Sequence, residues 1–160
     1  MNITENINRL SFYILAFLMI PLKSGNTQEV NFQELLVDVD YAEFVTHIWT
    51  PKSANAETII ALPGSGADVS RYKYIGPLLA KAGYKLVAIN QRGILGSSGN
   101  LEGITLRDLA RDVVTIADKL GINKFHMAGW AFGNRTSRML ATIYPERLAS
   151  LILIAAGGLV

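Results

Sequence analysis

The stretch MAGWAFGNR, Met127 to Arg135, joins an apolar run to a segment with helical periodicity. Gly129 and Gly133 lie two positions on either side of Ala131. Because glycine lacks a Cβ, it lets two backbone segments approach closely and lets the chain change direction sharply. The spacing predicts a tight strand-to-helix turn centred on Ala131.

The segments around this turn alternate between strand and helix. Short apolar runs without polar alternation are typical of strands buried on both faces. Four such runs occur, at TIIALP (58–63), KLVAIN (85–90), KFHMAG (124–129) and LILIAA (151–156). Helical periodicity predicts helices over residues 77–83, 106–120 and 132–144. For the second of these, Thr105 is the expected N-cap, Asp108 completes a capping box and Gly121 follows the end.

This alternation predicts an α/β fold with a mainly parallel, doubly wound sheet and helices on both of its faces. Two earlier stretches, Leu35–Val39 and Glu43–Thr50, are rich in β-branched and aromatic residues. We expect them to form an N-terminal hairpin.

Composition excludes several classes of protein. The 160 residues include 15 basic and 13 acidic side chains, for a formal net charge of +2, and the charges form no blocks. There is no electrostatic case for a nucleic-acid partner. Cysteine is absent, which excludes disulfides, a thiolate zinc site and a cysteine nucleophile. No metal or other cofactor is predicted.

The N-terminus suggests a compartment. Arg9 precedes an apolar segment over residues 10–22, which resembles the hydrophobic region of a secretory signal. A spanning helix needs roughly 20 apolar residues, so this segment is short for one. The interpretations are a signal peptide or membrane anchor over 1–24, or a helix packed on the domain. We expect an exported (periplasmic or secreted) or membrane-anchored protein, touching membrane only through 10–22, with a linker at 25–34 and the domain at 35–160.

A dinucleotide site is the first alternative for the glycine-rich stretch LPGSGADV (62–69). Gly64 and Gly66 follow a predicted strand, but Val69 stands where a third small residue is needed. The next strand ends in Asn90 rather than in the acidic residue that would bind a ribose. Gly64 and Gly66 supply two of the four features of such a site, and the third small residue and the acidic residue are missing, so this interpretation is weak.

Three segments together resemble the α/β-hydrolase superfamily. ALPGSGADVSRY (61–72) looks like the loop after the third strand, and MAGWAFGNR resembles the nucleophile elbow. AINQRGILGSSG (88–99) is similar to the Asp-x-Arg-Gly-x-Gly-x-Ser segment, with Asn90 in place of Asp and one extra residue before Gly96. The resemblance covers about residues 30–160. It implies the N-terminal part of such a domain, truncated before the last strands.

The resemblance also implies roles for particular residues. Ala131 occupies the nucleophile position, usually a serine, and its methyl group cannot attack a carbonyl. The elbow glycines are Gly129 and Gly133, and the backbone amides of Ser65 and Phe132 are the expected oxyanion donors. The acid and the histidine would follow later strands, beyond residue 160. His47 and His126 are interpreted as structural.

The resulting hypothesis is a hydrolase of small ester-like substrates that is catalytically incomplete in this chain. Loss of a serine nucleophile removes about six orders of magnitude of rate. The alternatives are a non-catalytic protein that binds a small anion in the retained oxyanion pocket, or a decayed fragment. The apolar last strand would leave a sheet edge open to self-association.

Overall fold

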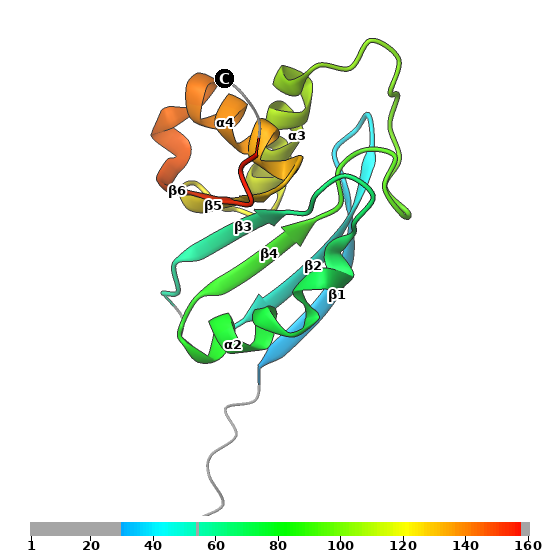
Figure 1. The fold of residues 1–160 in the computed structure, drawn as a ribbon. Coiled ribbons are helices and arrows are strands. Elements are labelled where there is room, and N and C mark those ends of the chain that lie inside the picture. The colour runs from blue at the N-terminus through cyan, green and yellow to red at the C-terminus, as the bar shows by residue number, and fades with distance from the viewer. Residues whose placement is uncertain (1–29, 54, 158–160) are drawn as a thin grey trace, which may run out of the picture.

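A six-stranded sheet runs through the computed structural model, which describes residues 30–53 and 55–157 (Figure 1). The strands are β1 (Asn31–Asp38), β2 (Glu43–Thr50), β3 (Thr58–Leu62), β4 (Lys85–Ile89), β5 (Phe125–Trp130) and β6 (Leu148–Ile154). Their order is β1-β2-β4-β3-β5-β6. The last four pair in parallel, whereas β1 pairs with β2, and β2 with β4, in antiparallel fashion. The predicted mainly parallel sheet with an N-terminal hairpin is confirmed.

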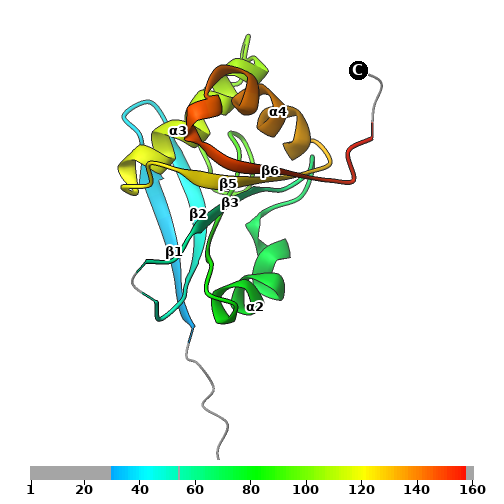
Figure 2. The ribbon, with the colours of Figure 1, turned by 90° about the vertical axis from the view of Figure 1, so that its left-hand side faces the viewer.

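Helices cover both faces of the sheet. Figure 2 shows α3 (Leu106–Lys119) and α4 (Gly133–Ile143) on one side and α2 (Ile75–Lys81) on the other. Two 3-10 helices, η1 (Val69–Lys73) and η2 (Pro145–Arg147), complete the described elements. η1 is not predicted from the sequence, and α2 begins two residues before the predicted start at residue 77.

The expected linker over residues 25–34 is wrong at its C-terminal end. β1 already begins at Asn31, and the side chains of residues 31–36 are all exposed rather than alternately buried. Within the described residues β1 is an edge strand that pairs with β2. Backbone pairing with β2, from Asn31 opposite Thr50 onward, holds these residues. Polar residues such as Gln33 and Glu34 therefore occur in a strand that hydrophobic patterning does not reveal.

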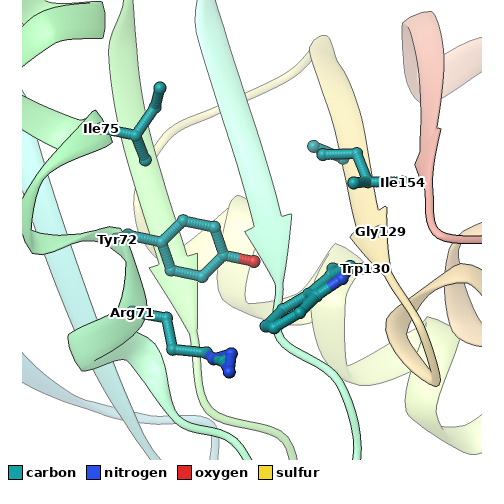
Figure 3. A pocket seen from close by; sticks show the side chains of 7 residues that line it. Arg71, Tyr72, Ile75, Gly129, Trp130 and Ile154 are labelled. Carbon is teal, nitrogen blue, oxygen red and sulfur yellow. The ribbon is translucent and has the colours of Figure 1, made fainter.

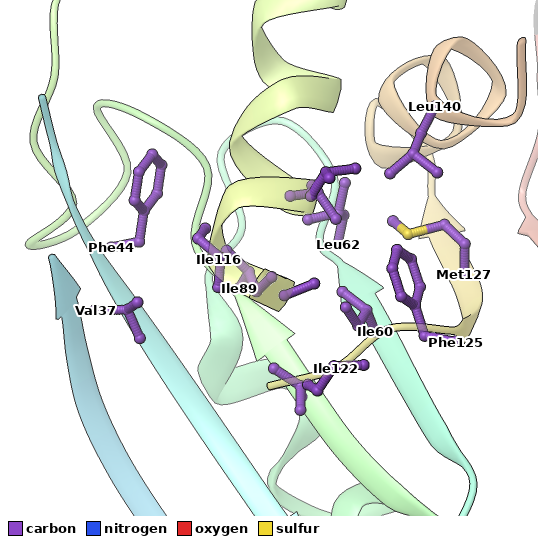
Figure 4. Close-up of a cluster of buried hydrophobic side chains, with 14 of the residues drawn as sticks. Val37, Phe44, Ile60, Leu62, Ile89, Ile116, Ile122, Phe125, Met127 and Leu140 are labelled. Atoms are coloured by element: carbon purple, nitrogen blue, oxygen red, sulfur yellow. The ribbon is translucent and has the colours of Figure 1, made fainter. Parts of the chain in front are cut away.

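The main hydrophobic core lies between the sheet and the α3–α4 layer (Figure 4). Ile60 and Met127 from the sheet, Ile116 from α3 and Leu140 from α4 are fully buried there. Burying one such side chain contributes roughly 1.5–3 kcal/mol. A second cluster, which includes Trp49, Val69 and Ala80, packs under α2. The two clusters lie on opposite faces of the sheet, and together they hold β5 in position between them.

β6 differs from the buried strand that its sequence suggested. Leu151, Ile152, Leu153 and Ile154 are 37–51% exposed. Within the described residues β6 has β5 as its single neighbouring strand and contacts α4 on one face. The composition of LILI is that of a buried strand, but the structure leaves these side chains accessible. Self-association through this edge stays a prediction.

The expected leader, residues 1–24, lies outside the described residues. Among the helices that the structure does describe, none has the length and apolar character needed to span a bilayer.

The first prediction concerns the start of α3, which is capped as expected. The Thr105 side chain accepts a hydrogen bond from the Asp108 backbone amide, and the Asp108 carboxylate accepts one from the Thr105 amide. We expect T105A to lower the free energy of unfolding by about 1 kcal/mol, measured by urea denaturation. The control is T142A, where the exposed hydroxyl only bonds the Arg138 carbonyl within its own helix. An equal loss in both variants would contradict a specific capping effect.

Candidate active site

The turn between β5 and α4 holds Ala131 in a left-handed conformation, with φ of 48°. Its amide donates to the Ile154 carbonyl at 3.0 Å, and its carbonyl accepts from the Asn134 amide at 3.1 Å. A non-glycine residue in this conformation costs of order 1–3 kcal/mol. The turn is therefore strained at Ala131, the position to which the sequence resemblance assigns the nucleophile, and hydrogen bonds on both sides hold it.

The two elbow glycines lie where strand and helix cross most closely. A Cβ built on Gly129 would lie 2.5 Å from the Ser137 Oγ and 2.6 Å from the Gly133 carbonyl oxygen. One built on Gly133 would lie 2.6 Å from the Leu62 carbonyl oxygen. Real Cβ atoms do not approach backbone atoms this closely, so any side chain at either position would push β5, α4 and the end of β3 apart.

The loop after β3 meets this turn directly. A Cβ on Gly64 would lie 3.0 Å from the Ala131 Cβ and 3.9 Å from the Phe132 amide nitrogen. Ser65, the next residue, lines a cavity of about 170 Å³ together with Phe132. Across residues 30–53 and 55–157, neither the Ser65 nor the Phe132 backbone amide donates a hydrogen bond. Their assignment as oxyanion donors stays a prediction.

Asn90 braces the loops on either side of the cavity. It is 1% exposed, its Oδ1 accepts from the Val69 amide at 2.8 Å, and its Nδ2 donates to the Leu95 carbonyl at 3.1 Å. The Asn90 carbonyl also accepts from the Ser97 hydroxyl. An aspartate would supply the acceptor for Val69 but not the donor to Leu95, so the departure from the family pattern has a local structural use.

Arg92 is tied into the domain rather than directed at the turn. Its Nε and Nη2 donate to the two carboxylate oxygens of Asp112 at 2.6 and 2.7 Å, and its Nη1 donates to the Asn100 carbonyl. The Tyr41 hydroxyl donates to the same Asp112 carboxylate. Burial, the largest effect, raises the pKa of Tyr41, so that this phenol stays a donor. A bidentate pair of this kind fixes the position of the 91–104 loop.

Gln91 links this loop to α4. The Thr136 hydroxyl donates to the Gln91 Oε1 at 2.8 Å, and both residues are buried. The Ser137 hydroxyl donates to the Gly133 carbonyl at 2.8 Å. The hydroxyls of Thr136 and Ser137 therefore both have hydrogen-bond partners. Neither hydroxyl is free to replace a nucleophile at position 131.

Two further hollows flank the turn. One of about 410 Å³ is lined by Ala131, Phe132, Arg135, Ala155 and Gly157. The other, of about 250 Å³, lies toward α2 (Figure 3), where the Arg71 guanidinium stacks 3.9 Å from the Trp130 ring centroid. Burial raises the pKa of Tyr72, which also lines this second hollow, so its hydroxyl stays neutral. Of the described residues that line these two hollows and the 170 Å³ cavity, none is a histidine, an aspartate or a glutamate.

Both histidines have partners away from the turn. His126 Nδ1 lies 2.8 Å from the Ser150 Oγ across β5 and β6, and His47 Nε2 lies 3.3 Å from the Glu34 carboxylate across β1 and β2. In the described part of the chain, no three side chains of the metal-binding types come together. No local sequence pattern marks Tyr41, Gln91 or Asp112, because their hydrogen-bond partners lie 20–71 positions away in the sequence.

Residues 57–159 match the family model described as alpha/beta hydrolase fold. This chain belongs to the α/β-hydrolase fold family. Its sheet order, elbow and glycine contacts agree with that assignment.

The chain is similar to curated enzymes of the family. It is 30% identical over 151 residues to 2-hydroxy-6-oxo-6-phenylhexa-2,4-dienoate hydrolase of Comamonas testosteroni, covering 88% of this chain and 49% of that enzyme. It is 35% identical over 113 residues to 2-hydroxy-6-oxononadienedioate/2-hydroxy-6-oxononatrienedioate hydrolase of the same species, covering 67% of this chain and 39% of that enzyme. The chain thus spans half or less of the length of these relatives.

Solved structures support the same fold. The crystal structure of Cfl2 from Burkholderia cenocepacia superposes with a TM-score of 0.71 at 22% identity, covering 81% of this chain and 46% of that one. At this identity the likeness shows the fold alone.

The second prediction concerns the strain at Ala131. Glycine adopts a positive φ without the steric cost that a Cβ brings. We expect A131G to raise the free energy of unfolding by about 0.5–1 kcal/mol, measured by urea denaturation. The control is A128G inside β5, where added backbone freedom should lower it by a similar amount. Destabilisation by A131G would show that the turn carries no such strain.

The third prediction concerns the Arg92–Asp112 pair. The side chains are 13% and 5% exposed, so D112N leaves a guanidinium largely out of water without its counter-charge. We expect a loss of about 3 kcal/mol in the free energy of unfolding. D118N, which breaks the exposed ion pair with Arg147, should cost less than about 1 kcal/mol. Equal losses in chemical denaturation would refute a special role for the buried pair.

Proposed function

We propose that this chain provides the oxyanion-binding part of a hydrolase site for small ester-like substrates, and that it is catalytically incomplete because Ala131 cannot form an acyl-enzyme. The proposal is carried by the elbow geometry, with Ala131 at φ 48°, together with the adjacent Ser65 and Phe132 backbone amides, which donate no hydrogen bond to any residue of 30–53 or 55–157. The family assignment supports hydrolysis as the reaction class of the whole protein.

Backbone donors act on the charge that a carbonyl oxygen gains when its carbon is attacked. The Ser65 and Phe132 amides come from two different loops, which Gly64 lets approach each other. Phe132 also precedes the first turn of α4, which contains no acidic residue. The partial positive charge of the helix N-terminus is thus not neutralised by a neighbouring side chain. When the nucleophile is lost, such donors would still give a hydrolysis rate about 10³- to 10⁴-fold above that of the uncatalysed reaction in water.

The same donors also support binding without chemistry. A carboxylate, like the oxyanion, presents a negatively charged oxygen that accepts hydrogen bonds from backbone amides, so a small carboxylate is the simplest ligand for this site. The absence of a histidine or carboxylate from the lining of the three cavities favours this second function for the chain by itself. Both functions use the Ser65 and Phe132 amides.

The fourth prediction is that small carboxylates stabilise the full chain. Acetate and pentanoate should raise the melting temperature relative to chloride at equal ionic strength. Once the carboxylate concentration exceeds its dissociation constant, the rise should be proportional to the logarithm of that concentration. F132P removes the Phe132 N–H at a φ of −61°, which proline adopts, and should abolish the shift. F132A removes the ring but keeps the amide and should retain it.

Circular dichroism melts establish that each variant folds, and G64A, whose Cβ would crowd Ala131, is a second variant expected to weaken binding. Equal shifts in F132P and the unmodified chain would refute the amide site. Catalytic incompleteness is checked with 4-nitrophenyl acetate: a burst of nitrophenolate from the unmodified chain would show that an acyl-enzyme forms and would overturn that part of the proposal.

A further inference from the structure

We propose that Gln91 is a ligand-binding residue whose side-chain nitrogen donates a hydrogen bond to an acceptor oxygen on a short apolar ligand. The ligand would occupy the cavity between Ser65 and Phe132. This inference rests on the proposed function, because the same ligand's carboxylate or carbonyl would meet the Ser65 and Phe132 amides. It adds a second polar group to the ligand and sets its position.

The cavity is small and mostly apolar. Its volume is about 170 Å³, and its walls include Ile94, Leu101, Ile104, Leu109 and the Phe132 side chain. Sites for drug-sized ligands are about 300–1,000 Å³, so this one suits a chain of a few carbon atoms. Apolar pockets select among such ligands through the few polar groups in their walls.

Gln91 is a polar residue in these walls whose side chain has a donor available to a ligand. It is 9% exposed, and its Oε1 is held by the fully buried Thr136 hydroxyl. That hydrogen bond fixes which end of the amide faces α4. Among residues 30–53 and 55–157 the Nε2 donates no hydrogen bond to a protein atom, and it is not one of the buried atoms left without a partner, so solvent or a ligand can reach it. A ligand oxygen that replaces water on this donor would gain one neutral hydrogen bond.

The other polar groups in the wall are already engaged or exposed. Each nitrogen of the Arg92 guanidinium donates to Asp112 or to the Asn100 carbonyl. Ser65 is exposed, so solvent meets its hydroxyl. Because Asp112 neutralises Arg92, the cavity offers a ligand tail no free charge. The preferred tail therefore has a neutral acceptor, such as a ketone or ether oxygen, rather than a second carboxylate.

The test compares two carboxylates of equal chain length by titration calorimetry on the full chain. 4-Oxopentanoate carries a ketone oxygen that pentanoate lacks. The unmodified protein should bind 4-oxopentanoate about fivefold more tightly, the effect of one neutral hydrogen bond. Q91M keeps the length of the side chain and removes the donor, so the ratio of the two affinities should fall to about one while pentanoate affinity is retained.

The matched control is Q33M, the same change at an exposed glutamine on β1, which should leave the fivefold preference intact. Q91E is a second variant that keeps an acceptor for Thr136 without the donor, and it should also lose the preference. If pentanoate fails to bind, or binds F132P equally well, the proposed function fails. If pentanoate binds through Phe132 but 4-oxopentanoate is not preferred, or is still preferred by Q91M, the assignment of Gln91 is wrong and the proposed function stands.

Discussion

The structure depends on the close crossing of β5, α4 and the end of β3 at the Ala131 turn. This crossing requires the absence of side chains at Gly129 and Gly133, where a Cβ would lie 2.5–2.6 Å from neighbouring atoms. It also requires a residue that accepts a positive φ between them. The burial of Leu62 and Met127 on either side stabilises the crossing against that local cost. Packing of the whole sheet therefore positions one backbone amide, that of Phe132.

The loops that follow β3 and β4 lie beside the turn, and buried polar groups hold both of them in place. Asn90 joins the start of η1 to the loop that follows β4, and Gln91 joins that loop to α4. Arg92 ties it to Asp112 on α3. The side chains of Asn90 and Arg92 have partners at each of their polar atoms, and Gln91 is held through its Oε1, so the arrangement is specific as well as stable. The three consecutive residues NQR thus connect every element around the 170 Å³ cavity.

Local signals made most of the fold predictable. The apolar runs gave β3, β4 and β5, and the Thr105 capping box gave the start of α3, because these features depend on residues close in sequence. β1 began earlier than predicted, and η1 was missed, since an edge strand and a short 3-10 helix depend on backbone pairing and on Asp68 capping. The contacts of Gln91 and Asp112 were beyond sequence reasoning because each joins elements at least 20 positions apart.

The strain at Ala131 has a consequence for what this site can be. In a working serine hydrolase the strained turn lifts a hydroxyl above the sheet. Here it lifts a methyl group, and the cost of order 1–3 kcal/mol supports no attack on a carbonyl. What the same turn still does is place the Phe132 amide at the head of α4, beside Ser65 and the cavity that Gln91 also lines. This geometry therefore supports the proposed binding of a small oxygen-bearing ligand rather than attack on a carbonyl.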